Sequence, residues 1–548
     1  MKILLIVPNY GRENYQHIPL GVMYISAYLK QKGYSVDALN LNHYPESKLK
    51  DVLLACNYDA VGTGGLFIHM PQMIAIIQTV RELAPKACIF LGGAIASADP
   101  DFILPELRPD VLVLGEGEVT TDLLLKALGS GGDFHRVTGI AFLENGRVVK
   151  TPPTPLIEVL DELPFPDYEG FEYGVFLDQY VNHVEQELCA IQGNDFVRRP
   201  AFPVSSRDCV SQCTFCFRIT GGNYRVRSIA NFMAEIRYLV ETYKVNILYI
   251  ADEMFITDKK RAKEACRELK TLGLPWLCQA RVPSLDDDLL AMLKDSGCYL
   301  LSMGFESASP TVLKSMKKGI SPAQIERGIL GCIKAKLCIQ GGFIFGDPAE
   351  TLETLGETIA FARKFPKIDI IFAPIHPYPG TTLYHDLVRS GKLDDRRTHH
   401  MSPSSRHYNM TKLSEDEYDY MYKKAIFESV YRTRALYAKV FVLGKRPDGR
   451  HVLNIHCSFC GGLNENCYLD LSHSASAWRG FIICKHCFQR TFIDRSDPRF
   501  FDLEMFKYQM RFLWIIRWMV ISPGVFRFFL PIRRFYAFMK RGKHAVIN

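Results

Sequence analysis

The chain has 548 residues, of which 48% are hydrophobic and 23% are charged, and its formal net charge is +7. This length is too great for one hydrophobic core, so about two to four domains are expected and a single small binding module is excluded. The balanced composition also excludes a largely disordered, collagenous or coiled-coil chain.

The basic residues are unevenly placed along the chain. Residues 505–548 contain nine Lys or Arg and no acidic residue, so the rest of the chain is close to neutral. The body of the protein is therefore not expected to bind nucleic acid. Sixteen cysteines and no signal peptide predict a cytoplasmic, reducing location, where clustered cysteines bind metal more often than they form disulfides.

The first 150 residues alternate between short apolar runs and helical patterns. We expect strands at 3–7, 34–41, 60–63, 87–91 and 111–114, and helices at 20–32 and 72–83. Glycines follow several of the strands. This pattern predicts an α/β, Rossmann-like doubly wound sheet over residues 1–150 that holds a ligand along the carboxyl ends of its strands.

The glycine loops of this region resemble the cobalamin-binding domain that precedes many radical S-adenosylmethionine (SAM) enzymes. The resemblance implies cofactor contacts at Pro19, Leu20, Gly21, Thr63, Gly64, Gly92, Gly93, Gly115, Glu116, Gly117 and Glu118. The DxHxxG motif is absent, so cobalamin is expected without a histidine ligand to cobalt. The alternative is a domain that keeps the fold and binds nothing, because glycines at strand ends also serve plain turns.

A proline-rich linker is predicted at 151–195, since proline at this density cannot continue a helix or a central strand. Beyond it, Cys209, Cys213 and Cys216 have CxxxCxxC spacing. Three thiolates on one short loop can hold three corners of a [4Fe-4S] cluster and leave the fourth iron open to a small molecule. A structural zinc site would need a fourth ligand, and the loop has none beside it.

This triplet resembles the signature of the radical SAM superfamily, including the aromatic Phe215 before the third cysteine. Strands followed by acidic, glycine or proline loops and then helices predict a partial (β/α)6 barrel over 196–400, with the site at the carboxyl ends of its strands. The resemblance implies SAM contacts at Asp252, Glu253, Gln279, Arg281, Glu306 and Gly346. For each polar residue taken alone, an ordinary loop or barrel salt bridge is the alternative.

Beyond a helical connector at 401–450, a second cysteine set occupies residues 451–495. Cys457, Cys460, Cys484 and Cys487 form two CxxC knuckles, which predicts a zinc-ribbon-like domain. A further iron–sulfur cluster is the alternative for the same four thiolates. Few basic residues accompany the ribbon, so a structural or partner-docking role is expected rather than nucleic-acid binding.

The last segment, 496–548, interleaves basic residues with Trp and Phe, which is typical of an amphipathic segment at a bilayer interface. Arg517 and the Pro523–Gly524 pair argue against a membrane-spanning helix. The tail therefore predicts peripheral contact with the inner face of the membrane and raises the prospect of a lipid-linked substrate. The alternative is a helix pair packed on the barrel or in a dimer.

The combined resemblance implies a cobalamin-dependent radical SAM enzyme that methylates an unactivated carbon of a small-molecule or lipid-linked substrate. A 5′-deoxyadenosyl radical would abstract hydrogen and methylcobalamin would supply the methyl group, with electrons from a flavodoxin or ferredoxin. A cyclase or rearranging enzyme with the same cofactors, or a non-catalytic scaffold, remain as alternatives. A methylthiotransferase is disfavoured because the N-terminal region has no second cysteine triplet.

Overall fold

The computed structural model describes residues 1–11, 18–179, 187–402, 407–469 and 479–494. The chain divides into two compact units. The first comprises Met1–Asn182, Arg198–Lys364 and Ile370–Tyr422, and the second comprises His183–Val197, Phe365–Asp369 and Lys423–Asn548. The predicted tail at 496–548 lies outside the described residues. Among the helices that are described, none has both the length and the apolar character needed to cross a bilayer.

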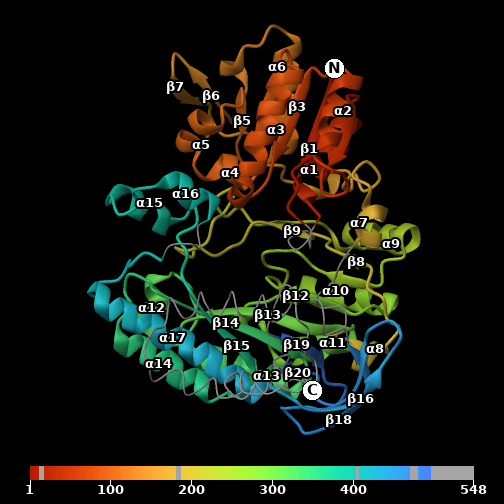
Figure 1. Ribbon diagram of the computed structural model, residues 1–548, viewed down its shortest axis with the longest axis vertical. Coiled ribbons are helices and arrows are strands. Elements are labelled where there is room, and N and C mark those ends of the chain that lie inside the picture. The colour runs from red at the N-terminus through yellow and green to blue at the C-terminus, as the bar shows by residue number, and fades with distance from the viewer. Residues whose placement is uncertain (12–17, 180–186, 403–406, 470–478, 495–548) are drawn as a thin grey trace, which may run out of the picture. The chain divides into compact units, whose positions relative to one another are not determined.

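The first unit begins with a seven-stranded sheet in the order β2-β1-β3-β4-β5-β6-β7 (Figure 1). Its five parallel strands are β1 (Lys2–Val7), β2 (Ser35–Asn40), β3 (Ala60–Gly64), β4 (Cys88–Gly92) and β5 (Val111–Val113). The helices are α1 (Leu20–Gln31), α2 (Ser47–Ala55), α3 (Met70–Leu83), α4 (Ala94–Ala98), α5 (Pro100–Leu107) and α6 (Gly117–Gly129). The predicted doubly wound sheet is confirmed.

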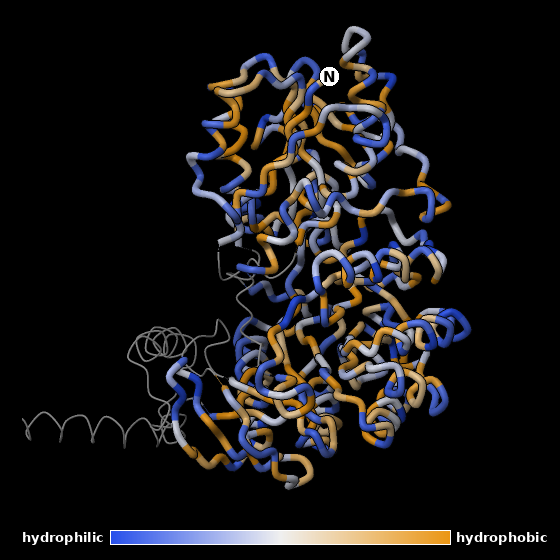
Figure 2. Tube along the Cα trace, turned by 90° about the vertical axis from the view of Figure 1, so that its right-hand side faces the viewer, coloured by the Kyte–Doolittle hydropathy of each residue, from blue (hydrophilic) through white to orange (hydrophobic). Residues whose placement is uncertain are grey.

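Packing explains why these strands were recognisable. α1 packs on α6 and α2 packs on α3, so helices cover both faces of the sheet. Strands buried on both faces are nearly continuous apolar runs, and residues 3–7 are at most 1% exposed. Figure 2 shows orange, hydrophobic segments in the interior of the part of the chain that includes the N-terminus.

The edge of this sheet was not predicted. β6 (Ile140–Glu144) and β7 (Arg147–Lys150) form an antiparallel hairpin that extends the sheet beyond β5. The hairpin turns at Asn145 and Gly146, whose φ angles are 49° and 75°. Asn-Gly is the sequence that a tight turn with two positive φ angles favours, so the signal was present in the sequence.

The second sheet of this unit has six strands in the order β15-β14-β13-β12-β11-β8. The strands are β8 (Pro200–Ala201), β11 (Ile247–Tyr249), β12 (Trp276–Gln279), β13 (Cys298–Glu306), β14 (Cys338–Phe345) and β15 (Asp369–Pro374). The helices are α9 (Ile229–Tyr243), α10 (Lys259–Leu272), α11 (Asp287–Asp295), α12 (Pro310–Ser315), α13 (Pro322–Lys334) and α14 (Leu352–Arg363). The six strands form the predicted partial barrel, with active loops expected at their carboxyl ends.

Two helices continue from β15 toward the N-terminal sheet. They are α15 (Thr382–Arg389) and α16 (Arg396–Met401), drawn in cyan beside α4 in Figure 1. α16 packs on α3 and on the short helix η1 (Phe67–His69), which follows β3. The segment predicted as a linker contains η3 (Leu160–Glu162), α7 (Tyr173–Gln179) and α8 (Cys189–Gln192) among its described residues.

The second unit contains two small antiparallel sheets. One consists of β16 (Lys439–Lys445), β17 (His451–His456) and β18 (Leu463–Leu469), and the other of β19 (Arg479–Ile483) and β20 (Arg490–Asp494). The helical connector predicted at 401–450 contains α17 (Glu415–Leu436), but its last part is strand β16. There Val440 and Val442 pack on the core while Phe441 and Leu443 are exposed, which is the alternation of a strand.

Candidate functional site

The cysteine loop is closed at its base by two short strands. β9 (Ser206–Arg207) and β10 (Arg225–Val226) pair antiparallel on either side of it. Within the loop, Arg218 donates to the carbonyl oxygens of Ser211 and Gly221, each at 3.3 Å. The conformation of the loop is therefore fixed by its own hydrogen bonds and by the strand pair at its base.

Phe215 anchors this loop on the barrel. Its ring packs against a buried cluster that includes Val312, Met316, Ile375 and Leu383. The amide of the preceding Thr214 donates to the carbonyl oxygen of Met316 at 3.2 Å. The aromatic residue of the motif thus packs on the barrel beside the cysteines.

The three thiols differ in burial. Cys213 is 9% exposed, Cys209 is half-buried and accepts a bond from the Ser211 amide at 3.4 Å, and Cys216 is exposed. Although the Cys216 residue is exposed overall, partial burial of its sulfur raises its pKa to about 11, with further contributions from the charge of Glu253 and from the two other thiols. Three free thiols on one loop with CxxxCxxC spacing match the three protein ligands of a [4Fe-4S] cluster.

Asp252 and Glu253 follow β11 and have different roles. The Asp252 carboxylate is fully buried and accepts bonds from the amide and hydroxyl of Ser205, both at 2.5 Å, and from the Ser206 hydroxyl at 2.7 Å. Asp252 therefore holds the segment leading into the cysteine loop. Glu253 is exposed and close enough to raise the pKa of Cys216, so it is the acidic residue open to a ligand there.

The remaining predicted SAM contacts also lie at the carboxyl ends of barrel strands. Gln279 ends β12 and is exposed. Arg281 donates to the Ser211 hydroxyl in the cysteine loop and to the Lys318 carbonyl oxygen, while its Nε is buried without a partner among the described residues. Glu306 ends β13 with a φ of 63° and pairs with Lys318 at 2.7 Å.

Gly346 follows β14 with a φ of 102°, a conformation that favours glycine. Its amide donates to the Glu350 carboxylate at 2.6 Å, and a Cβ built on it would lie 3.3 Å from the Tyr418 hydroxyl. Burial, with a smaller contribution from the charge of the nearby Asp347, raises the pKa of Glu350 to about 7. The loop therefore holds a carboxyl group that titrates near neutral pH.

This shift makes stability depend on pH. The folded protein binds the Glu350 proton more tightly than an ordinary carboxyl of pKa 4.5 does, so the stabilisation is complete below about pH 4.5 and is lost as pH rises to about 7. Glu350→Gln keeps an acceptor for the Gly346 amide but does not titrate. We therefore expect it to remove this pH dependence of the unfolding free energy, which amounts to up to about 3 kcal/mol in wild type. Melting curves from pH 5 to 8 test this. The exposed Glu357→Gln on α14 should behave as wild type.

The glycines of the N-terminal sheet gather at one edge. Gly64, Gly92 and Gly115 follow or end the adjacent strands β3, β4 and β5. A Cβ on Gly64 would lie 2.3 Å from the Gly92 carbonyl oxygen, and one on Gly93 would lie 3.0 Å from the Gly65 amide nitrogen. Only glycine allows these loops to approach so closely, whereas Gly115 borders open space.

Two buried polar atoms at this edge have no hydrogen-bond partner among the described residues. They are the Nδ1 atom of His69 and the Oε1 atom of Gln72. Both follow β3, and His69 stacks on Tyr10, which follows β1, at 4.1 Å. Unsatisfied polar atoms beside closely packed glycine loops fit an edge that receives a polar ligand such as cobalamin.

The other predicted cobalamin contacts are placed as follows. Pro19 caps α1, which begins at Leu20 and Gly21, and no atom lies within 4 Å of a Cβ on Gly21. The Thr63 hydroxyl donates to the Ile6 carbonyl oxygen at 3.0 Å, so it ties β3 to β1. Gly117 begins α6 and packs tightly on Ile25.

Glu116 and Glu118 form ion pairs with the two arginines that flank the cysteine loop. Glu116 pairs with Arg225 at 2.6 Å and with Arg207 at 3.1 Å, and Glu118 pairs with Arg207 at 2.6 Å. All four side chains are largely buried. Since both arginines lie in the strands that close the cysteine loop, these pairs hold the N-terminal sheet against that loop.

A second connection lies at residues 377–380, after β15. The ring of Tyr378 lies 5.7 Å from that of Phe67. A Cβ on Gly380, whose φ is 83°, would lie 2.5 Å from Phe217 of the cysteine loop and 3.0 Å from Ala98 of α4. The barrel loop is thus packed between the cysteine loop and the N-terminal sheet, so the carboxyl edges of the two sheets adjoin.

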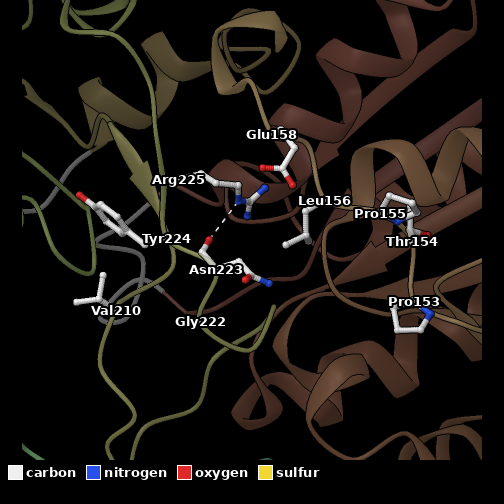
Figure 3. A pocket seen from close by; sticks show the side chains of 10 residues that line it. All are labelled: Pro153, Thr154, Pro155, Leu156, Glu158, Val210, Gly222, Asn223, Tyr224 and Arg225. Atoms are coloured by element: carbon white, nitrogen blue, oxygen red, sulfur yellow. Dashed lines mark hydrogen bonds between the residues drawn. The ribbon is translucent and has the colours of Figure 1, made fainter.

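A cavity of about 740 Å³ opens beside the cysteine loop. Residues 153–156 and Glu158 line one side of it, and Val210 with residues 222–225 line the other. Figure 3 shows Arg225 directed toward Glu158 and Leu156. Because Val210 directly follows Cys209, this cavity reaches the cysteine loop from outside.

The second cysteine set forms a compact four-sulfur group. The ligand atoms of Cys457, Cys460, Cys484 and Cys487 all lie within 4.8 Å of one another. Two of the sulfur–sulfur distances are 3.6 and 3.9 Å. Tetrahedral zinc with bonds of about 2.3 Å requires about 3.8 Å between sulfurs, so the group fits a single zinc ion.

Removing one ligand tests this assignment. Cys484→Ser is expected to release the zinc and to unfold the two small sheets, since structural zinc contributes directly to folding. Zinc content and protease resistance of residues 439–494 are the measurements. Cys467→Ser is the matched control, because Cys467 is equally buried nearby but lies outside the four-sulfur group. Equal zinc loss in both variants would contradict the assignment.

Comparisons with known proteins agree with this geometry. The B12 binding domain model matches residues 11–125, and the Radical SAM superfamily model matches residues 204–362. The chain is similar to an uncharacterized methyltransferase of Pyrococcus horikoshii, with 28% identity over 72% of this chain and 84% of that protein. It is also similar to the anaerobic magnesium-protoporphyrin IX monomethyl ester cyclase of Rubrivivax gelatinosus, with 29% identity over 71% of this chain and 70% of that protein.

Among solved structures, the fold is similar to that of the radical SAM methyltransferase TsrM of Kitasatospora setae, solved with tryptophan substrate and a SAM analog. The TM-score is 0.59 at 18% identity, covering 71% of this chain and 76% of that one. The two domain matches fall on the glycine edge and on the cysteine loop with its barrel. The chain therefore belongs to the radical SAM enzymes that carry a B12-binding domain ahead of the barrel.

Proposed function

We propose that this enzyme transfers a methyl group to an unactivated carbon of a small-molecule substrate. The observation that carries the proposal is that the carboxyl edge of the B12-binding sheet adjoins the cysteine loop, through the ion pairs of Arg207 and Arg225 and the packing of Gly380. A substrate bound between these edges would be reachable from both cofactors. The similarity to a methyltransferase over most of both chains supports the same function.

The residues of the chain divide the work. Cys209, Cys213 and Cys216 would hold the cluster, and Glu253 with the Nε of Arg281 would contact SAM near it. The loops at Gly64, Gly92 and Gly115 would hold cobalamin. When bound, these cofactors supply the radical that removes hydrogen and the methyl group that replaces it. The protein orients the reactants and excludes water.

A cyclase is the second candidate, because one relative of comparable identity is a magnesium-protoporphyrin IX monomethyl ester cyclase. Both reactions would use the same cofactors, so the distinction lies in the product.

We further infer that a flavodoxin or ferredoxin supplies the electrons, and that the tail at 496–548 brings the enzyme to the membrane surface.

The test is anaerobic reconstitution with iron, sulfide and hydroxocobalamin, followed by turnover with SAM that carries a deuterated methyl group. One cobalamin per chain and labelled methyl groups in a small-molecule product would support methyl transfer. Cleavage of SAM without bound cobalamin would refute it and leave a cobalamin-independent radical enzyme. A product that gains a ring but no label would favour the cyclase.

A further inference from the structure

A row of aromatic and imidazole rings runs from the B12-binding sheet to the barrel. Its members are Phe67, Tyr378, His376, His407, Tyr422 and Phe345. Successive ring centres are 5.7, 5.9, 5.6, 4.6 and 5.6 Å apart. These separations lie within the range of interacting aromatic pairs, and the planes of successive rings are inclined by 31°, 54°, 33°, 45° and 71°, so the six rings form one continuous chain of tilted contacts.

The two ends of the row coincide with the two cofactor regions. Phe67 lies in η1, directly after the glycine loop of β3. Phe345 is the last residue of β14 and precedes Gly346. A substrate that both cofactors must reach would therefore lie along this row.

The middle of the row is accessible while its ends are buried. Phe67 and Phe345 belong to the core, whereas Tyr378 is 39% exposed and His376, His407 and Tyr422 are half-buried. The partly exposed rings offer their open sides to a ligand. The buried ends fix the row in place.

The two imidazoles have unused hydrogen-bonding capacity. The Nδ1 atoms of His376 and His407 have no hydrogen-bond partner within the described part of the chain. The other nitrogen of His407 bonds the Tyr422 hydroxyl at 3.0 Å. Unsatisfied ring nitrogens amid aromatic rings suit a ligand that presents both a flat face and polar atoms at its edge.

The row is also uncharged near neutral pH. Burial lowers the pKa of His376 to about 4, with smaller effects from His407 and His399, and burial likewise lowers the pKa of His407. Neither imidazole therefore supplies a cation for a phosphate or carboxylate. The chemistry of the row is stacking and neutral hydrogen bonding.

We propose that this row is one wall of the substrate site and that the substrate is a flat, conjugated ring system in contact with Tyr378, His376 and His407. Because these three rings are inclined to one another, the substrate would stack on the face of one and meet the others at an angle. The inference rests on the proposed function, because that function places the substrate between the two cofactors. The proposal therefore favours a ring substrate over the lipid-linked substrate that the sequence of residues 496–548 suggested. A prenyl chain has no ring face to stack on the row.

The test measures ligand retention by holoprotein containing the cluster, hydroxocobalamin and SAM, using ultrafiltration and chromatographic quantification. The probes are magnesium protoporphyrin IX monomethyl ester as a flat ring and farnesyl phosphate as a ringless lipid. We expect the porphyrin to be retained and farnesyl phosphate not to displace it. Affinity for the porphyrin should fall at least tenfold in His376→Ala/His407→Ala and in Tyr378→Ala.

Two further variants separate stacking from nonspecific adsorption. His376→Phe keeps a flat ring but loses the ring nitrogens, so its affinity should lie between those of wild type and His376→Ala/His407→Ala. Phe441→Ala removes an exposed ring of the second unit and should change nothing. Cobalamin occupancy equal to wild type shows that each variant is folded.

The inference is overturned if wild type does not retain the porphyrin, if the alanine variants with normal cobalamin occupancy retain it equally, or if farnesyl phosphate displaces it. SAM cleavage and cofactor content are measured in the same samples. Normal cofactors and cleavage without porphyrin retention refute the ring site alone. Absent cobalamin refutes the methyl-transfer proposal instead.

Discussion

Replacing Cys209, Cys213 and Cys216 together by Ala is expected to remove about four iron atoms per chain and to abolish SAM cleavage, by about a thousandfold or more, while cobalamin remains bound. The three thiols are the ligands that the loop offers, and the open iron is the site at which SAM would be held. The B12-binding sheet has its own buried core, so losing the cluster should leave that domain folded. Iron analysis, corrinoid content and chromatography of 5′-deoxyadenosine measure the three effects.

Cys56→Ala is the matched control for this variant. Cys56 is a partly exposed cysteine of the B12-binding domain, away from the cysteine loop. It should leave iron content and cleavage unchanged. The assignment fails if the triple variant keeps its iron, or if Cys56→Ala loses as much iron as the triple variant does.

The parts of the fold that could be predicted depend on local pattern. The strand expected at 3–7 is Lys2–Val7, and the helix expected at 72–83 is Met70–Leu83. Both follow from apolar spacing within the segment itself. The hairpin at Asn145 and Gly146 follows the same rule, because the Asn-Gly pair that favours its turn lies within the segment itself.

Features of the site that depend on distant partners could not be predicted in this way. The cysteine motif is a spacing within one loop, so it was visible in the sequence. The pairing of Glu118 with Arg207 joins residues 89 positions apart, and the sequence around Glu118 contains no pattern that identifies Arg207 as its partner. The ring row likewise joins η1, β14, the loop after β15 and α17, and only the fold brings those segments together.

The arm formed by α15 and α16 supplies the last prediction. Asp99, which is 5% exposed, accepts bonds from Arg396, from the Tyr384 hydroxyl and from His400 Nε2, the last at 3.2 Å. Burial by itself raises the pKa of Asp99, but the bonds from His400, Arg396 and Tyr384 outweigh it and lower the pKa to about 2. This network fastens the arm of the barrel to the B12-binding domain.

Asp99→Ala is expected to cost about 3–5 kcal/mol, because it leaves Arg396 and two other polar groups without their buried acceptor. The arm should then release α4, and the spacing between the two sheet edges should no longer be fixed. A lower melting temperature and weaker magnetic coupling between cob(II)alamin and the reduced cluster are the measurements. Since the pKa of Asp99 is lowered, part of this stabilisation, about 2 kcal/mol, should be lost in wild type as pH falls from about 4 toward 2.

Asp101→Ala separates this effect from a general loss of charge on the same helix. Asp101 pairs with Lys150 at 2.7 Å, but its side chain is 61% exposed, and exposed pairs contribute at most about 1 kcal/mol. It should therefore leave both the melting temperature and the magnetic coupling close to wild type. If Asp99→Ala lowers stability but leaves the coupling intact, the network serves folding alone. Loss of coupling with both cofactors still bound identifies Asp99 as the residue that positions one domain over the other.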